Sequence, residues 1–389
     1  MEKKRTPRLR FRGFTDDWEQ RKLGVAVQIT MGQSPDGNTY SEEPSDYILV
    51  QGNADLKDGW VTPRVWTTQK TKTCDAGDLI MSVRAPAGAM GKTAYYAVIG
   101  RGVAAIKGNE FIYQTLVKMD SDGYWKKLAA GSTFESINSD TVADAEILIP
   151  SESEQQQIGA FFSALDRTIT LHQRKYDMLK KVQKAMLEKM FPKNGKRVPE
   201  IRFAGFTDDW EQRKLGECFS ERVESMPDGE LISVTINDGI KKFSELGRHD
   251  NSNDNKSKYK KVCVGDIAYN SMRMWQGASG YSPYEGIVSP AYTVLSPNAG
   301  VFSRCIAYQF KLPQMIHTFQ INSQGITSDN WNLKYPTLSE IEIYISKNVA
   351  EQKQIAEFFT SLDHLITLHQ RKLEKLNKLK KSMLEEIFV

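Results

Sequence analysis

The chain contains two repeated blocks, and this internal repetition constrains its fold more than any other feature of the sequence. Residues 9–24 read LRFRGFTDDWEQRKLG, and residues 201–216 read IRFAGFTDDWEQRKLG. A second, longer block covers residues 154–191 and returns with substitutions at residues 351–388. The segments between the repeated blocks look almost unrelated. Because internal repetition determines architecture, we expect one scaffold that is built twice and carries two different surfaces.

Both copies of the longer block have the residue spacing of a long helix with one apolar seam. Apolar residues and a histidine recur every three or four positions, with charged or amide residues between them. No proline interrupts either copy, and Pro192 follows the first. An ordinary core helix is the alternative, but the length and the repeated seam favour a helix pair. The predicted seam residues are Ile158, Phe162, Leu165, Ile169, His172, Tyr176, Ile355, Phe359, Leu362, Ile366, His369 and Leu373.

The remaining segments predict α+β domains. Short runs of β-branched and aromatic residues lie among Gly and Pro turns, as is typical of strands. We expect strands at residues 47–50, 78–81, 95–99, 145–149, 231–236, 265–269 and 341–345. The expected boundaries are a first globular domain at 1–150, a helix at 151–191, a second domain at 192–348 and a second helix at 349–389.

This order of elements predicts an antiparallel helix pair with a pseudo-two-fold axis. The first helix ends where the second domain begins, and the second helix leaves that domain, so it must run back to pair with the first. His172 and His369 lie in the middle of their blocks. Pairing without stagger would therefore place both in one layer. A polar seam residue sacrifices some stability and can fix register; the alternative is that each histidine packs as a neutral aromatic.

A weaker similarity links the two divergent segments. Residues 77–91 and 265–280 both contain Gly-Asp, a short predicted strand, and then Arg-x3-Gly-x2-Gly. Glycines permit tight turns and close approach of a ligand. An arginine at a strand end can bind a guanine edge or a phosphate. We therefore expect Arg84 and Arg273 at a DNA-binding surface, with a structural turn and a solvated arginine as the alternative.

Other basic, amide and aromatic residues gather in the polar stretches around these motifs. Such groups suit salt-sensitive phosphate binding, although a charge run is often merely solvated. The candidate DNA-binding residues are Gln33, Ser34, Arg64, Lys70, Lys72, Arg84 and Lys92 in the first segment, and Lys241, Lys242, Arg248, Lys258, Arg273, Trp275 and Gln276 in the second.

The sequence offers little support for catalysis, metal binding or membrane insertion. The net charge of +4 permits nucleic-acid binding without arguing for it. No apolar run is long enough to span a membrane. The 4 cysteines are far apart, as in a reduced cytoplasmic protein. We find no methyltransferase tetrad and no P-loop. One loose nuclease-like spacing, Asp36 followed by Asp55-Leu-Lys57, has no counterpart in the other half. We therefore predict no catalytic residue and no metal ligand.

The chain resembles the specificity subunit of type I restriction-modification enzymes. The resemblance is carried by the EQxxI, FF, LD and ITLHQRK elements of the longer block, by the recurring GFTDDWEQRKLG and by the divergent segments between them. The resemblance covers essentially the whole chain. It implies two target-recognition domains that each read one half of a split double-stranded DNA sequence, held apart by the helices. It also implies a subunit without catalysis of its own. Two modification subunits would methylate adenine with S-adenosylmethionine, and restriction subunits recruited through them would use ATP and Mg to translocate and cut DNA.

Two other functions stay open at the level of sequence. A self-sufficient metal-dependent nuclease would depend on the weak acidic spacing, and a scaffold for protein partners would not bind DNA. The physical pattern favours the DNA reader. Two related domains can approach two major-groove segments about one turn, or 34 Å, apart. Because the domains differ, the expected target has two unlike half-sites, and helix length would set the spacer between them.

Overall fold

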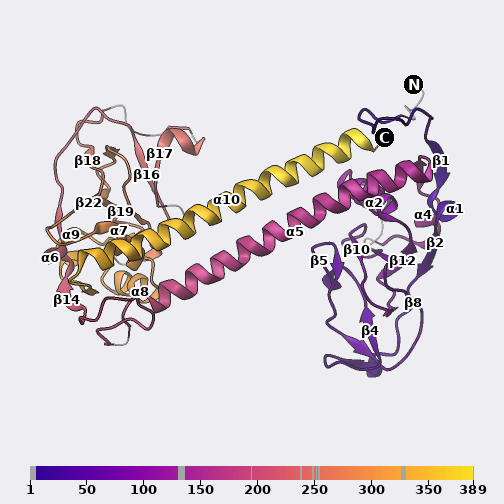
Figure 1. Cartoon of the computed structure of the whole chain (residues 1–389), viewed down its shortest axis with the longest axis horizontal. Coiled ribbons are helices and arrows are strands. Elements are labelled where there is room, and N and C mark those ends of the chain that lie inside the picture. Colours follow the sequence, from indigo (N-terminus) through magenta and orange to yellow (C-terminus); the bar gives the residue numbers. More distant parts are fainter. Residues whose placement is uncertain are drawn as a thin grey trace. The chain divides into compact units, whose positions relative to one another are not determined.

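The computed structural model describes residues 6–129, 136–193, 195–236, 239–247, 249–250, 252, 255–325 and 330–388. It divides into two compact units. The first combines Met1–Lys175 with His369–Val389, and the second is Tyr176–Leu368. The division falls inside both long helices, α5 (Glu152–Lys189) and α10 (Val349–Ile387), which are labelled in Figure 1. Each unit therefore holds one globular domain, the start of the helix that follows it and the end of the other helix.

The first domain is built around two larger sheets. One has the strand order β2 (Gln28–Met31), β12 (Val103–Lys107), β9 (Leu79–Ser82), β10 (Met90–Lys92), β6 (Trp60–Val61) and β5 (Leu56–Lys57). The other has the order β3 (Tyr40–Ser41), β7 (Trp66–Thr67), β4 (Tyr47–Val50), β11 (Ala97–Ile99) and β8 (Thr73–Cys74). A separate pair joins β1 (Glu19–Lys22) to β13 (Glu146–Ile149). The short helices are α1 (Leu23–Ala26), α2 (Glu110–Ser121), α3 (Tyr124–Ala129) and α4 (Ser139–Ala143).

The second domain keeps the central part of this arrangement. Its largest sheet has the order β15 (Phe219–Glu221), β22 (Tyr292–Pro297), β19 (Ile267–Asn270) and β20 (Ser279–Tyr281). Three strand pairs accompany it: β14 (Glu211–Lys214) with β23 (Glu342–Ile345), β16 (Ile232–Thr235) with β17 (Gly239–Lys242), and β18 (Lys260–Val262) with β21 (Gly286–Val288). Helical segments are α6 (Leu215–Cys218), η3 (Phe243–Leu246), η4 (Met274–Gln276), α7 (Ser303–Gln309), α8 (Pro313–Ile321) and α9 (Tyr335–Ser339).

The α+β fold with two long helices is confirmed. Predicted strands at 47–50, 145–149 and 341–345 correspond to β4, β13 and β23. Several short strands, among them β2, β12, β15 and β22, were not predicted.

A repeated ion pair explains why the two recurring blocks occur together. Arg10 donates from Nε and Nη2 to the two carboxylate oxygens of Glu154, at 2.7 and 2.8 Å. Arg202 forms the same fork with Glu351, at 2.6 and 2.9 Å. Both glutamates are at most 1% exposed and lie in the first turn of α5 and α10. Since a buried carboxylate needs a close cationic partner, the glutamate of the second block requires the arginine of the first.

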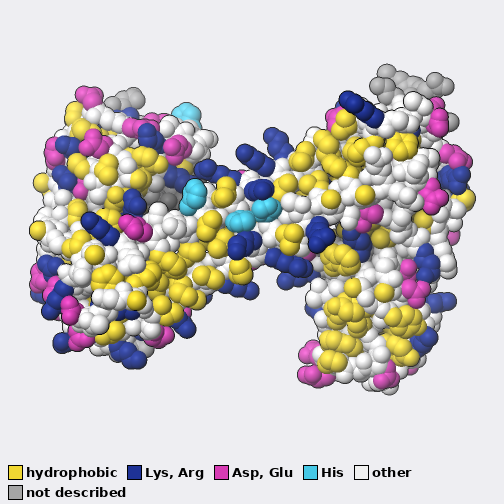
Figure 2. Space-filling model, viewed as in Figure 1, with side chains coloured by type: hydrophobic (Ala, Val, Ile, Leu, Met, Phe, Trp, Pro, Cys, Tyr) yellow, Lys and Arg dark blue, Asp and Glu magenta, His cyan; other side chains and the backbone are white. Residues whose placement is uncertain are grey.

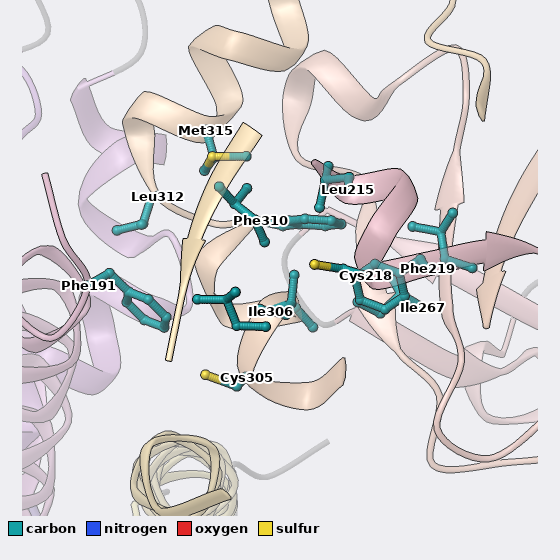
Figure 3. Packing of buried hydrophobic residues seen from close by; sticks show 14 of the residues in the cluster. Phe191, Leu215, Cys218, Phe219, Ile267, Cys305, Ile306, Phe310, Leu312 and Met315 are labelled. Carbon is teal, nitrogen blue, oxygen red and sulfur yellow. The ribbon is translucent and has the colours of Figure 1, made fainter. Parts of the chain in front are cut away.

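The end of each long helix packs into the domain that precedes the other long helix. In the first unit, Phe388 contacts Trp18 at 6.4 Å and Phe162 at 5.7 Å between ring centroids. In the second unit, Phe191 contacts Trp210 at 6.0 Å and Phe359 at 6.2 Å. Figure 3 shows Phe191 in the core of the second domain with Ile306, Phe310 and Leu312. These contacts join each domain to both helices through the burial of large aromatic side chains.

The predicted seam residues follow the helix pair inside each unit. Those nearest the domains are buried, and those further along are half-buried except for Leu373, which is also buried. The first unit contains an ion pair of 2.6 Å between Asp166 of α5 and Lys380 of α10. In the second, Gln183 of α5 donates to Asp363 of α10. Within each unit the two helices therefore run antiparallel, as predicted.

The two seam histidines meet in one layer. Nδ1 of His172 lies 2.8 Å from Nδ1 of His369, so one ring donates and the other accepts. The prediction of a shared layer is confirmed. Burial, Lys372 and the facing imidazole together lower the pKa of His172.

Candidate nucleic-acid interface

The two divergent segments contain the same central hairpin. Strand β9 pairs antiparallel with β10 and β12, as β19 does with β20 and β22. A glycine with positive φ precedes each central strand, at 97° for Gly77 and 99° for Gly265. The aspartate after each glycine, Asp78 or Asp266, accepts a hydrogen bond of 2.8 Å from the backbone N–H three residues earlier. The weak similarity in sequence therefore reflects a shared backbone structure.

The turn after β19 presents cationic, aromatic and amide groups. Arg273 is exposed, whereas the next residue, Met274, is fully buried and anchors the turn in the core. Trp275 is half-buried and packs edge to face on Trp331, with ring centroids 5.2 Å apart. Gln276 Oε1 lies 3.5 Å from Arg273 Nη1. A guanidinium and an amide that can bind base edges or phosphate thus share one short turn.

The corresponding turn of the first domain is built differently. Arg84 is also exposed, and its backbone forms an isolated bridge with Ser136. Gly88 has φ of 104°, and a Cβ added there would lie 2.4 Å from Oδ1 of Asp120. Burial raises the pKa of Asp120. Both arginines lie in the turn after the central strand, Arg84 two residues beyond β9 and Arg273 three residues beyond β19, and different side chains support the two turns.

Several predicted residues of the first domain come together at one end of its sheets. Ser34 Oγ accepts a hydrogen bond of 3.1 Å from the backbone N–H of Arg101. The carbonyl of Gln33 accepts from Thr71 Oγ1 at 2.6 Å, and Lys72 follows directly. Arg101 is exposed and was not predicted. Its only sequence signal is its place between two glycines after a strand.

Other predicted cations of the first domain are engaged by neighbouring side chains. Lys70 lies 5.5 Å from the ring centre of Tyr96 and lowers the pKa of that phenol. Arg64 Nε donates to Asp55 Oδ1 at 2.9 Å but remains half exposed. Lys92 forms an ion pair of 2.9 Å with Glu110, and its side chain is only 16% exposed. The side chain of Lys92 is therefore engaged within the domain, which does not favour a DNA contact by this residue.

The basic stretch of the second domain also contains both a lysine bound by neighbouring side chains and an exposed lysine. Lys242 pairs with Glu230 at 2.7 Å and lies over the ring of Tyr284. Lys241 precedes it in β17, and Lys258 is exposed. Arg248 lies outside the described residues. Figure 2 shows Lys and Arg side chains interspersed with Asp and Glu on the visible face of both domains, so charge alone does not define an interface.

The nuclease-like spacing does not form an acidic site. Asp55 is buried, and its carboxylate accepts from the Arg64 guanidinium and from the backbone N–H groups of residues 51 and 52. Within the described ranges, no group of three or more His, Cys, Asp or Glu side chains is arranged to hold a metal ion. No helix in the described part of the chain is long and apolar enough to cross a membrane.

The chain is thus a protein of two unlike α+β domains on a repeated scaffold. The chain belongs to the family described as the type I restriction modification DNA specificity domain, whose model matches residues 15–181 and 207–378. Each half of the chain therefore supplies one such domain.

Relatives and a solved structure agree with this assignment. The MjaX specificity subunit of Methanocaldococcus jannaschii is 29% identical over 182 residues, and this match spans 44% of the chain and 42% of that relative. The type I restriction enzyme MjaVIII specificity subunit of the same organism is 22% identical over 95% of the chain and 91% of the relative. The fold is similar to the crystal structure of a type I system S subunit from M. genitalium, with a TM-score of 0.67, 14% identity and 99% of both chains covered.

Proposed function

We propose that this chain selects the DNA target of a type I restriction-modification complex by reading two unlike half-sites, one with each domain. The observation that carries the proposal is the contrast between the shared scaffold and the divergent surfaces on equivalent hairpins. Arg84 and Arg273 both lie in the turn that follows the central strand of their own domain, each exposed beside different neighbours. Two different surfaces at equivalent positions suit an asymmetric, bipartite target.

The chain would direct chemistry carried out by other subunits. The matching family is described as a DNA specificity domain, and the relatives are named specificity subunits. We infer that two modification subunits supply adenine methylation with S-adenosylmethionine, and that restriction subunits supply ATP- and Mg-dependent translocation and cleavage. A self-sufficient nuclease has no support, because Arg64 and backbone N–H groups already bind the carboxylate of Asp55.

The direct test is to map methylated adenines in the DNA of a host that expresses this chain together with its modification partner. We expect modification at one asymmetric sequence with two specified parts and an unspecified spacer. Omission of this chain should abolish that pattern. A complex that forms but neither binds DNA nor methylates it at a defined sequence would favour the protein-scaffold function.

A further inference from the structure

Lys311 lies beside the turn that carries Arg273, and its ammonium binds backbone carbonyls of that turn. Its ammonium donates to the carbonyl oxygens of Gly277 at 2.6 Å and Ser279 at 2.8 Å. It also donates to the carbonyl of Ile236 at 3.2 Å. An ammonium group has three N–H donors and no acceptor, so these three carbonyls satisfy it completely.

The position of Lys311 is fixed by its neighbours in the chain. Phe310 and Leu312, on either side, are at most 2% exposed and belong to the core of the second domain. The backbone N–H of Lys311 donates to the carbonyl of Tyr308 at 3.0 Å. The ammonium is therefore held from a rigid base between α7 and α8.

The three carbonyls belong to two segments that both carry candidate DNA-binding residues. Gly277 and Ser279 close the turn that follows Arg273, and Ile236 lies next to the hairpin of β16 and β17, which contains Lys241 and Lys242. These segments approach closely, since a Cβ added to Gly280 would lie 2.9 Å from the Cα of Gly239. Lys311 thus stands where the two candidate surfaces join.

Fixing residues 277–279 also places Arg273. The carbonyl of Arg273 accepts from the backbone N–H of Gln276 at 3.0 Å and of Ala278 at 3.2 Å. The carbonyl of Ala278 accepts from the N–H of Asn270, at the end of β19. Displacement of this stretch would therefore move the base of the Arg273 side chain.

We propose that Lys311 is a positioning residue for DNA recognition by the second domain, holding the Arg273 turn and the β16–β17 hairpin in a single orientation. The proposal rests on the proposed function. Burial lowers the pKa of Lys311 to about 8, which shows that its ammonium lies largely out of solvent. Lys311 would touch no DNA itself.

The test compares Lys311→Met with Lys347→Met, which removes an exposed lysine from the same unit. Each variant is expressed with the modification partner, and methylated adenines are mapped genome-wide. For Lys311→Met we expect discrimination at the second half-site to fall about tenfold, with the first half-site and the thermal stability of the first unit unchanged. Lys347→Met should match the wild type.

Hydrogen exchange of the purified chain provides a readout independent of DNA. In Lys311→Met, amides near residues 236 and 274–280 should exchange faster, and those of the first domain should not change. If Lys311→Met does not fold, Lys311→Arg decides by the same methylation map. A planar guanidinium cannot direct its donors to three convergent carbonyls as an ammonium does, so we again expect relaxation of one half-site.

Two results would overturn the proposal. One is full retention of both half-sites in a folded Lys311 variant, while Arg273→Ala alters the second. The other is equal loss at both half-sites, which would mean a general effect on stability. If the wild-type chain directs no bipartite methylation, the proposed function fails, and the two failures are thereby distinguished.

Discussion

The two domains are attached to their helices in the same way, but they support the turns of the candidate DNA interface in different ways. The fork between Arg10 and Glu154 recurs between Arg202 and Glu351 with distances that agree within 0.1 Å. The turn after the central strand is instead packed near Asp120 in the first domain and bonded to Lys311 in the second. The comparison shows that attachment is constrained by a few buried contacts, which leaves the reading surface free to diverge.

The largest effect should follow from breaking a fork. Arg202→Met leaves the buried carboxylate of Glu351 without its cation, and we expect a loss of about 3–5 kcal/mol in the unfolding free energy of the second unit. Arg10→Met should cost the first unit a similar amount. Denaturant unfolding checks both values.

The control for this prediction is Arg21→Met. That residue pairs with Glu19 at 2.6 Å, but both side chains are about half exposed or more. We expect a much smaller change, because solvent screens an exposed ion pair. If the fork variants cost no more than this control, the forks do not hold the domains to the helices.

The next effect concerns Arg273 and Arg84, the exposed arginines of the two candidate turns. Arg273→Ala should weaken binding by about 1–3 kcal/mol if its contact is a bidentate base contact, and it should relax only the second half-site. Arg84→Ala should do the same for the first. Binding assays with DNA altered in one half-site measure the difference. Unchanged affinity and unchanged methylation in both variants would remove these residues from the interface.

A smaller effect on stability should come from a pair of contacts between α5 and α10 that differs between the two units. Asp166 faces Lys380, whereas the equivalent Asp363 faces Gln183, and burial raises the pKa of Asp363. Gln183→Lys gives that carboxylate a cationic partner. We expect the pKa of Asp363 to fall and the second unit to gain up to about 1 kcal/mol, less at high salt.

The reverse change, Lys380→Gln, is the matched control. It should destabilise the first unit by a comparable amount and remove its salt dependence. An equal response of both units to salt in the wild type would contradict the distinction between the two pairs.

The smallest effect should come from the histidine layer. The lowered pKa of His172 means that folding disfavours its protonation. This stability is present above the unfolded pKa, near 6.5, and is lost as pH falls towards the lower folded value. Replacing both seam histidines by Leu should remove that acid sensitivity and slightly raise the melting temperature. His364→Leu, at an exposed site of α10, should leave the pH dependence intact.

The long helices could be predicted from the sequence, whereas many strands could not. An uninterrupted seam over more than ten turns has few alternative interpretations. In contrast, Val103–Lys107 contains two alanines and is buried on both faces of β12, so it shows no alternation that would distinguish a strand from a helix. The residues of the candidate interface also differ in how far the sequence could single them out. Arg84 and Arg273 could be singled out because two glycines follow each of them at the same spacing, and their role stays a prediction.

Lys311 and Lys92 show what the sequence could not reveal. A single lysine between Phe310 and Leu312 gives no sign that its ammonium will bind backbone carbonyls from two distant segments. Lys92 is a residue type expected at a DNA contact, yet its ammonium pairs with Glu110 and lies over the ring of Tyr113. In both cases the partner is set by tertiary packing.

Exchange of one whole domain tests the central claim most directly. Residues 217–348 would be replaced by the equivalent segment of another family member, which keeps both long helices, both forks and the recurring block that ends at Gly216. Methylated adenines would then be mapped in a host that expresses the hybrid with the modification partner. We predict that one half-site changes to that of the donor, while the other half-site and the spacer stay the same. A change in both half-sites would contradict independent reading by the two domains.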